Sequence, residues 1–354
     1  KETHVKMDYT VIPRAVFTDP EVASVGLRAA EARAQGMEVE ADCLDLAHGP
    51  KAAAIYQTKG LVKMVIDKET KRQSEVLEMI HSENYASVAV RQAVGSVFMN
   101  KYAEGQAGKR YYQGNSIVDQ LESLCKARAL DLFNLDADKW GVNVQALSGS
   151  PANLSIIAAL LEPHEKILSM YLPDGGHLSH GWQLPEKKVT IQSKFWHVEF
   201  YHVDKASRVF DYNQIEKQAK EFRPTLLISG GTAYPREIDH KRMGEIAQSV
   251  GAYYLADVSH EAGLIAGGAN TSPFAFADVV MMTTHKTLRG PRGAIIFSKK
   301  KLSAAIDQSV FPSIQGGPHE HTIAGIAVAL KEAMSPAFKQ YAKQTVVNAQ
   351  MLSD

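Results

Sequence analysis

Cysteine is scarce in this chain of 354 residues, which contains only Cys43 and Cys125, and the two do not form a C-x-x-C pair. So few thiols cannot build a disulfide framework, and their scarcity favours a reducing compartment. Long apolar runs are also absent, since none approaches the roughly 18 residues that a membrane helix needs. The opening stretch, KETHVKMDYT, lacks the apolar core of a signal peptide. We therefore expect a cytoplasmic protein.

An excess of charge of one sign is missing too, because 39 Lys and Arg residues balance 39 Asp and Glu residues. Without a bulk charge, the composition does not favour nucleic acid or a membrane surface as a partner. Hydrophobic residues make up 45% of the sequence, which suits a globular chain with a large buried core. We expect small molecules and other protein subunits as partners, and neither nucleic acid nor membrane.

Two unlike pieces follow one another along the chain. The first 72 residues contain β-rich segments at 10–18 and 61–66 and a helical segment at 28–35. From Gln73 onward, helical and strand patterns alternate, which predicts a mainly parallel sheet with helices on both faces. The sequence therefore indicates an α/β unit preceded by a small α+β fragment. Its buried strands are predicted at 225–229, 252–256, 278–282 and 294–297.

Three helices can be predicted in more detail. In one, Ser150 is expected to be the cap and Pro151 the first helical residue. In another, Gly251 is expected to end a helix that buries one apolar face. The predicted buried positions are Leu121, Leu124, Cys125 and Leu132 in the helix at 116–133, and Met243, Ile246, Ala247 and Val250 in the helix before Gly251.

Two polar residues that suit pyridoxal-phosphate chemistry follow predicted strands. Asp257 ends one strand in LADVSH, and Lys286 follows another in TTHKTLRGPRG. A pyridoxal-phosphate site needs a lysine to form the imine and an acid to keep the pyridine nitrogen protonated. Such ligands bind beyond the carboxyl ends of parallel strands. Alone, a loop lysine is usually solvated and a strand-end aspartate is often a helix cap, but together they indicate this site.

The remaining parts of such a site have candidates as well. Ser148, Gly149 and Ser150 precede a helix, where free N–H groups and hydroxyls form a cradle for a phosphate. Alone they would be an ordinary cap; with Lys286 they indicate a phosphate site. His177 in DGGHLSHG is a candidate ring-covering side chain. The pairs His177 with His180 and His319 with His321 resemble metal ligands, but no carboxylate or cysteine lies at metal-site spacing, so we expect no metal.

A series of motifs, in order along the chain, is similar to that of the serine hydroxymethyltransferase family. They are HSENY, NKYAEGQAGKRYYQG, WGVNVQALSGSPAN, LPDGGHLSHG, AYPREID, LADVSHEAGLIAGG, TTHKTLRGPRG and QGGPHEHTIAGIAVALKEAM. The match runs from Ser74 to the end. The resemblance implies a fold-type-I large domain, pyridoxal 5'-phosphate as cofactor and tetrahydrofolate as co-substrate. The implied reaction converts serine and tetrahydrofolate to glycine and 5,10-methylenetetrahydrofolate.

The resemblance also implies roles for individual cofactor-binding residues. Lys286 would form the imine, Asp257 would pair with the pyridine nitrogen, and His177 would stack on the ring. The family often has serine at the Thr232 position, and both residues carry a hydroxyl. The other implied positions are Thr232 and His260 near the phenolic oxygen, Ser148, Gly149 and Ser150 around the phosphate, and Tyr102 and Gly317 from a neighbouring subunit.

The substrate side is implied in the same way. Glu104 would be the acid–base group near the serine hydroxyl, with Tyr112 beside it, and His285 joins the catalytic set next to the lysine. Sites shared between subunits imply a homodimer or tetramer. The implied substrate positions also include Ser82 at the amino-acid carboxylate, Tyr111, Leu172 and Leu178 at the folate pocket, and Arg292, which supports the site.

The first 72 residues resemble a different family. VIPRAVFTDPEVASVGL and AAIYQTKGLVKMVIDKETKR are similar to part of the dimerisation domain of flavin-dependent disulfide reductases, nearest to mercuric reductase. The paired redox cysteines and a G-x-G-x-x-G motif are absent, so we expect no flavin chemistry. We expect three parts: a reductase-like fragment at 1–72, a pyridoxal-phosphate-binding domain at 73–330, and the start of a C-terminal domain at 331–354.

Two other functions are compatible with these motifs. The resemblance implies that the arginine which holds the substrate carboxylate lies beyond Asp354, so the chain could be a non-catalytic fragment that binds the cofactor or only dimerises. Alternatively, it could be a folate-independent aldolase of β-hydroxy amino acids. The set Glu104, Tyr112 and Leu172 favours the folate enzyme.

Overall fold

The computed structural model describes residues 14–16, 22–24, 29–34, 39–45, 61–67, 73 and 80–353. The chain divides into two compact units, Lys1–Met79 and Ile80–Asp354. Within the described ranges, every helix is too short or too polar to cross a membrane.

The described residues of the first unit include short antiparallel strand pairs and a short helix. Strand β1 (Arg14–Val16) pairs with β2 (Val22–Ser24), and β3 (Val39–Asp45) pairs with β4 (Leu61–Asp67). Helix α1 (Ala29–Ala34) confirms the helical pattern at 28–35, and β4 confirms the strand at 61–66. The predicted β-rich segment at 10–18 is confirmed only in β1, because its other residues lie outside the described ones.

The second unit is built on a seven-stranded sheet in the order β11–β8–β12–β13–β14–β15–β7. All its strands run parallel except β15, which is antiparallel to both of its neighbours. The predicted mainly parallel sheet is therefore confirmed, and each predicted strand is found within two residues of its expected ends. The strands are β7 (Trp140–Asn143), β8 (Lys166–Met170), β11 (His197–Tyr201), β12 (Leu226–Ser229), β13 (Tyr253–Asp257), β14 (Val279–Thr283) and β15 (Ala294–Lys299).

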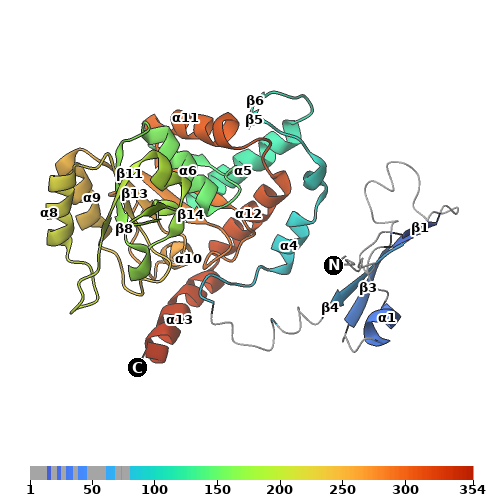
Figure 1. Cartoon of the computed structure of the whole chain (residues 1–354). Helices are drawn as coiled ribbons and strands as arrows, with labels where there is room; N and C mark the ends of the chain where they lie inside the picture. Colours follow the sequence, from blue (N-terminus) through green and yellow to red (C-terminus); the bar gives the residue numbers. More distant parts are fainter. Residues whose placement is uncertain are drawn as a thin grey trace, which may run out of the picture. The chain divides into compact units, whose positions relative to one another are not determined.

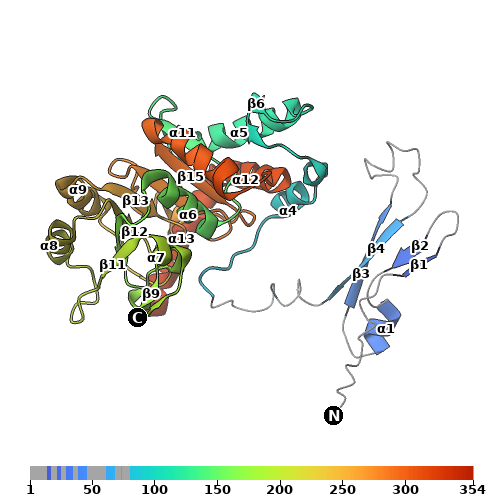
Figure 2. The ribbon, with the colours of Figure 1, turned by 45° about the horizontal axis from the view of Figure 1, so that its top comes forward.

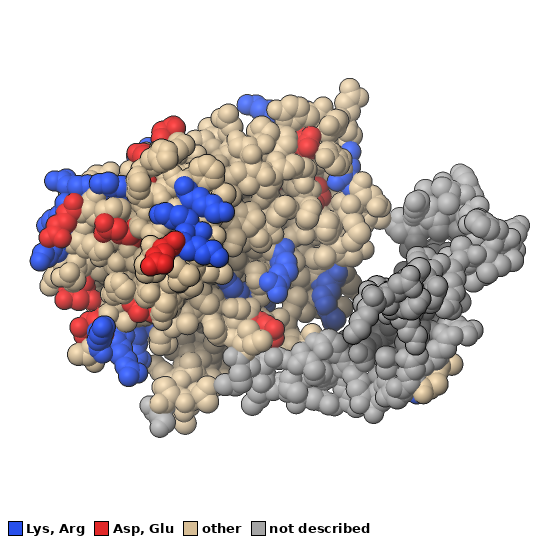
Figure 3. All heavy atoms as spheres, in the orientation of Figure 1, with Lys and Arg blue, Asp and Glu red and all other residues tan. Residues whose placement is uncertain are grey.

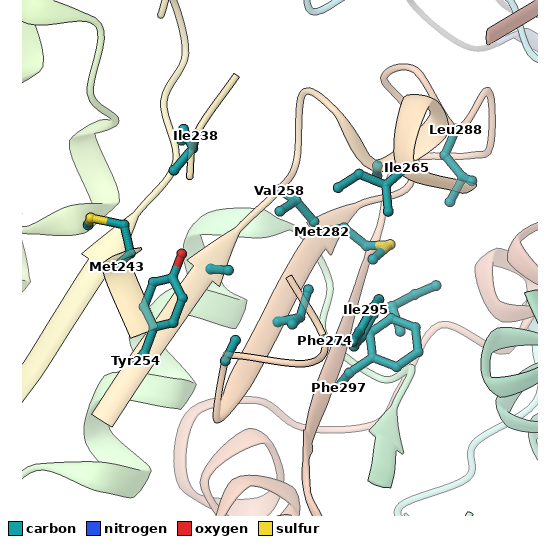
Figure 4. Close-up of a cluster of buried hydrophobic side chains, with 14 of the residues drawn as sticks. Ile238, Met243, Tyr254, Val258, Ile265, Phe274, Met282, Leu288, Ile295 and Phe297 are labelled. Carbon is teal, nitrogen blue, oxygen red and sulfur yellow. The ribbon is translucent and has the colours of Figure 1, made fainter. Parts of the chain in front are cut away.

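Alternate residues of each strand face two separate cores, as the period of two in a strand requires. In β14, Val279 and Met281 belong to one cluster, whereas Val280 and Met282 belong to the other. Figure 4 shows the second of these clusters, where Met282, Ile295 and Phe297 lie close to Phe274. Burial on both faces explains why the central strands β12, β13, β14 and β15 consist mainly of apolar residues.

Helices supply the other half of each core (Figures 1 and 2). The Met281 face is covered by α6 (Gly149–Leu160) and α11 (Lys300–Gln308). The Met282 face is covered by α5 (Ser116–Leu132), α8 (Tyr212–Phe222), α9 (His240–Val250), α10 (Ala262–Ala266) and α12 (Glu320–Ala333). The other elements are α4 (Val88–Val94), η2 (Val97–Asn100), β5 (Gly105–Gln106), β6 (Lys109–Arg110), η3 (Leu172–Asp174), η4 (Leu178–His180), β9 (Gln183–Leu184), β10 (Lys187–Lys188), α7 (Ile191–Phe195), η5 (Ser309–Ile314) and α13 (Pro336–Ser353).

The predicted apolar face of α5 was partly wrong. Cys125 is buried, but Leu124 is 45% exposed, and Leu121 and Leu132 are only half-buried. The buried stripe is Val118, Glu122, Cys125 and Ala129. Glu122 can occupy it because Arg110 and Lys126 neutralise its charge. The buried face of α5 therefore differs from the face predicted by counting apolar residues, because it includes a charged residue whose charge is paired.

The predicted start of α6 was also wrong by two residues, because Ser148 is the cap and Pro151 is the third helical residue. Close packing explains the shift. A Cβ atom at Gly149 would lie 2.6 Å from Thr283 Cγ2, so only glycine lets the helix begin against β14. Proline is tolerated in this first turn because its missing N–H would be unpaired there anyway. The prediction for α9 is confirmed for Met243, Ile246 and Ala247, which are buried, and for Gly251, which ends the helix in a left-handed conformation, whereas Val250 is half-buried.

The charged side chains on the surface include both basic and acidic residues. On the face drawn in Figure 3, basic and acidic side chains are interspersed over the second unit. This distribution agrees with the balanced composition of the chain.

Candidate active site

A cavity of about 310 Å³ opens at the carboxyl edge of the sheet. Its size falls at the lower end of the roughly 300–1,000 Å³ that small-molecule sites occupy. It is lined by Ser82, Ser148, Gly149, Ser150, Asn153, His177, Gly231, Thr232, Asp257, Ser259, His260, Met281, Thr283, His285, Lys286 and Arg292.

The sheet topology explains why residues so far apart in sequence meet here. Each of the parallel strands β7, β8, β12, β13 and β14 ends at this edge, and the segment after it supplies part of the lining. Strand β15 runs the other way, so the segment before it brings Arg292 to the same place. Most of the lining therefore comes from the ends and loops of six neighbouring strands, and Ser82 joins it from the segment before α4.

Asp257 is buried and fully hydrogen-bonded. Its Oδ2 accepts hydrogen bonds from His180 Nε2 at 2.9 Å and from Asn153 Nδ2 at 2.9 Å. Its Oδ1 accepts from the Ser259 backbone N at 3.1 Å and from Ser259 Oγ at 2.6 Å. Burial alone would raise the pKa of this carboxyl, but the hydrogen bond and charge of His180 hold it well below its ordinary value. Asp257 is therefore an ionised carboxylate with a fixed orientation.

Lys286 shares the cavity with Asp257 and is only 8% exposed. Burial lowers the pKa of its ammonium group, and the positive charge of Arg292 acts in the same direction, while Asp257 opposes both. A lowered pKa increases the fraction of neutral amine, which is the nucleophilic form. The lysine also has a fixed backbone, since Asn84 Nδ2 donates to its carbonyl oxygen at 3.0 Å.

Three histidines around the cavity are held neutral. Burial lowers the pKa of His177 to about 4, of His260 to about 3 and of His285 to about 4. The His177 Nδ1 atom accepts a hydrogen bond from the Ser179 backbone N at 3.2 Å, which fixes the ring. His285 Nε2 lies 3.3 Å from Arg292 Nη1. These rings can pack on an aromatic ligand without adding positive charge.

The start of α6 has hydrogen-bond donors without a side-chain partner. The Ser148 hydroxyl makes no capping hydrogen bond, so the helix start keeps unpaired N–H groups directed at the cavity side. Four buried atoms of lining residues also have no hydrogen-bond partner in the described part of the chain: Asn153 Oδ1, Thr283 Oγ1, His260 Nε2 and His285 Nδ1. A helix start with free hydroxyls suits a phosphate, and the lysine and aspartate suit the two ends of a pyridine aldehyde. The residues present therefore fit pyridoxal phosphate.

A second group of predicted site residues lies outside this cavity. Glu104, Tyr102, Tyr112 and Gly317 are not among its lining residues but lie near one another. The Tyr102 and Tyr112 rings are 5.7 Å apart, and a Cβ atom at Gly317 would lie 3.3 Å from Tyr102 Cζ. The negative charge of Glu104 raises the pKa of the Tyr102 phenol. We call these four residues the outer cluster.

The remaining predicted residues also lie outside the cavity lining. The Tyr111 ring packs 5.6 Å from that of Phe311. Leu172 begins η3, and Leu178 begins η4 and is 50% exposed. The predicted residues inside the lining are Ser82, Ser148, Gly149, Ser150, His177, Thr232, Asp257, His260, His285, Lys286 and Arg292.

Sequence reasoning missed the partners of Asp257. Asn153, His180 and Ser259 hold its carboxylate but were not assigned to the site. A signal existed for Asn153, which is a polar residue inside the otherwise apolar helix segment ANLSIIAAL. Across the residues that the structure describes, no three His, Cys, Asp or Glu side chains gather as a metal site.

Comparison with known protein families agrees with both resemblances. The family model of serine hydroxymethyltransferase matches residues 55–354. The model of the pyridine nucleotide-disulphide oxidoreductase dimerisation domain matches residues 12–73. The first match therefore begins earlier than Ser74, and the two overlap at residues 55–73.

Individual relatives carry the same family name. The chain is 50% identical to serine hydroxymethyltransferase 3, chloroplastic, of Arabidopsis thaliana, over 83% of this chain and 56% of that protein. It is 48% identical to the cytosolic serine hydroxymethyltransferase of Aspergillus fumigatus, over 82% of this chain and 65% of that protein. It is 46% identical to the mitochondrial serine hydroxymethyltransferase of Schizosaccharomyces pombe, over 85% of this chain and 65% of that protein. The chain thus spans less than two thirds of the length of these relatives.

Proposed function

The chain belongs to the serine hydroxymethyltransferase family, and from this premise we propose that its cavity binds pyridoxal 5'-phosphate and acts on serine and glycine. The observation that supports this most is the pairing of Lys286 with an ionised Asp257 in one cavity. When bound, this cofactor withdraws electrons from the α-carbon of an amino acid. We also propose the fold-type-I assignment, which the mainly parallel sheet supports.

The proposed roles of the cavity residues follow from their chemistry. Lys286 holds the cofactor covalently, and Asp257 keeps a proton on the pyridine nitrogen through an ion pair. His180, Asn153 and Ser259 keep that carboxylate ionised and oriented. His177 covers the ring, and Thr232 and His260 serve the phenolic oxygen. The start of α6, at Ser148, Gly149 and Ser150, binds the phosphate.

The substrate roles rest on residues at the rim and beyond. Ser82 and Arg292 line the cavity and would bind or support the amino-acid carboxylate. Glu104, with Tyr112 beside it, would move the proton of the serine hydroxyl, with tetrahydrofolate as the acceptor of the one-carbon unit. Leu172 and Leu178 would contact the folate. His285, next to Lys286, would belong to the catalytic residues, and Tyr111 would belong to the substrate-binding residues.

The outer cluster supports a site shared between subunits. In one chain, Tyr102 and Gly317 lie together but outside the cavity. Tyr102 is 59% exposed and Tyr112 is 52% exposed, so both can reach a second molecule. We propose a homodimer, or a tetramer built from it, in which the outer cluster of one subunit completes the cavity of the other.

Two further assignments stay predictions. The division into the parts 1–72, 73–330 and 331–354 is one, and its first boundary differs from that of the compact units, which divide after Met79. A cytoplasmic location is the other. It is supported by the low cysteine content, whereas the relatives carry names for the chloroplast, the cytosol and the mitochondrion.

A single titration tests the proposed function against its alternatives. The purified chain with added pyridoxal phosphate should absorb visible light, and the spectrum should change with glycine and again with tetrahydrofolate. A response to glycine alone would indicate the folate-independent aldolase. Cofactor absorption without either response would indicate a binding fragment, and no absorption would contradict the proposal.

A further inference from the structure

Arg110 makes an unusual set of contacts for a residue outside the cavity. Its side chain is only 3% exposed, at the end of the β5–β6 hairpin. Its Nη1 atom donates to the carbonyl oxygens of Ala103 at 2.9 Å and of Gly105 at 2.6 Å. These are the carbonyls on either side of Glu104, so one guanidinium nitrogen holds the backbone on both sides of that residue.

The other nitrogens of the same guanidinium bind two carboxylates of α5. Nε donates to Asp119 Oδ1 at 2.8 Å, and Nη2 donates to Glu122 Oε2 at 2.8 Å. Glu122 is fully buried and is also paired with Lys126. Gln145 Nε2 bridges the two sides, since it donates to Gly105 O at 2.9 Å and to Glu122 Oε2 at 3.0 Å. The segment around Glu104 is thereby tied to a helix of the core.

The side chain of Glu104 lies at the outer cluster. Its backbone oxygen accepts from the Tyr111 backbone N at 3.1 Å, which joins it to the stretch that ends in Tyr112. Its carboxylate acts on the Tyr102 phenol through its charge. A small rotation of the Ala103–Gly105 backbone would therefore change the distance between this carboxylate and Tyr102.

We propose that Arg110 is a positioning residue, which fixes the Ala103–Gly105 backbone on α5 and so sets where the Glu104 carboxylate lies. The inference rests on the proposed function for the role of Glu104 in catalysis, but the geometric part does not depend on it. Lysine cannot replace arginine in this role. A single ammonium lacks the planar fork that reaches two carbonyls and two carboxylates at once.

The geometric part is tested by the titration of Tyr102 in the full chain. Carbon-13 labelling at the tyrosine Cζ atoms gives one NMR signal for each phenol, and Tyr102→Phe assigns the signal of interest. Glu104→Gln should lower the pKa of Tyr102 towards its ordinary value, because the neighbouring charge is gone. Arg110→Lys should lower it in the same direction, because the carboxylate is no longer held in place.

Arg128→Lys is the matched control. Arg128 is half-buried and, like Arg110, donates to a backbone carbonyl, that of Ala327 at 2.7 Å, so the Arg128→Lys variant should leave the Tyr102 titration unchanged. A wild-type Tyr102 titration in a folded Arg110→Lys variant would overturn the proposal. If that variant does not fold, Asp119→Ala removes a carboxylate that anchors the Arg110 guanidinium on α5. A shift of Tyr102 in that variant supports the proposal, and no shift overturns it.

Kinetics supply the second readout. In Arg110→Lys, kcat for serine should fall by about tenfold or more, as misplaced catalytic groups cause. KM for serine and the cofactor spectrum should stay near the wild-type values, because Arg110 does not line the cavity. An unchanged kcat would overturn the catalytic part. If the wild-type chain itself shows no turnover, the proposed function fails, and the Tyr102 titration still decides the geometric part.

Discussion

The cavity and the outer cluster are assembled in different ways. The cavity residues follow the ends of neighbouring strands, and its key groups, Lys286 and Asp257, are less than one tenth exposed. Three residues of the outer cluster flank the small β5–β6 hairpin, Gly317 precedes α12, and Tyr102 is 59% exposed. The cavity residues are positioned by the sheet, whereas the residues of the outer cluster beside the hairpin depend on the ion pairs of Arg110.

From this difference we expect the cofactor-binding cavity to form within one chain and the outer cluster to serve a second subunit. A buried carboxylate with four hydrogen bonds is rigid before any ligand arrives, so its orientation does not depend on a partner. Exposed tyrosines are amphipathic and suit a contact with another protein surface. Cofactor binding should therefore depend mainly on the cavity, and turnover should depend on both regions.

The largest effect is expected within the cavity. Asp257→Asn cannot keep the pyridine nitrogen protonated by an ion pair, so exchange of the glycine α-proton should fall by about 10²–10⁴-fold. Visible absorption of the cofactor should remain. Asp278→Asn is the control, since Asp278 precedes β14 at the opposite end of the strand. Exchange at the wild-type rate in Asp257→Asn would remove this residue from its proposed role.

A mixing experiment tests whether the outer cluster serves a second subunit. Lys286→Ala and Glu104→Gln should each be nearly inactive alone. Refolded together, they should recover about one quarter of wild-type serine turnover, because half of the dimers are mixed and each has one intact site. If each site were complete within one chain, every site in the mixture would lack a residue. Turnover would then stay at the level of the single variants.

A smaller effect is expected where α6 meets β14. In Gly149→Ala, the new Cβ would lie 2.6 Å from Thr283 Cγ2, and overpacking of this kind costs about 1–3 kcal/mol. The helix start should shift, so we expect weaker pyridoxal-phosphate binding and a lower Tm. Gly95→Ala is the control, since its nearest neighbour, Arg91 O, would be 3.5 Å away. Equal affinities of Gly149→Ala and Gly95→Ala for pyridoxal phosphate would mean that Gly149 has no role in phosphate binding.

The smallest effect concerns Glu320, next to the ion network of Arg110. Burial and the charge of Glu122 raise the pKa of this carboxyl to about 8, while Asp119 adds to the rise and Arg110 and Lys126 oppose it. The folded state then keeps a proton that the unfolded state loses near the ordinary pKa. The free energy of unfolding should fall by up to about 1.4 kcal/mol per pH unit between the two pKa values, and should not vary with this group below them.

Glu320→Gln should remove this part of the pH dependence. The measurement is urea unfolding at several pH values from 5 to 8, with Glu332→Gln on the same helix as the control. The slope of stability against pH should be shallower in Glu320→Gln only. Parallel slopes in the wild type and both variants would mean that Glu320 titrates alike in the folded and unfolded states.

The sequence predicted the sheet and its cavity well because both depend on local patterns. Strand periodicity located the residues before Asp257 and Lys286, and parallel strands bring their ends to one edge. The same patterns could not predict that Leu124 is exposed whereas Glu122 of the same helix is buried. That burial depends on Arg110, which is twelve residues away in sequence.

Contacts between distant residues explain the other misses. The cap of α6 moved to Ser148 because Gly149 packs against a strand residue far along the chain, Thr283. His180 and Asn153 meet Asp257 only after folding, and their sequence separations from it are 77 and 104 residues. No local pattern carries such pairings, so the groups that orient Asp257 became visible only in the structure.

The most direct test of the account is to find which lysine carries the cofactor. Borohydride reduces the imine, and peptide mapping by mass spectrometry then locates the pyridoxyl group. We expect it on Lys286, with no labelling or visible absorption in Lys286→Ala. Lys299 is the matched control, because burial lowers its pKa too but it ends β15 at the other edge of the sheet and lies over the Trp140 ring. Lys299→Ala should label like the wild type, and a label chiefly on any lysine other than Lys286 would contradict the account.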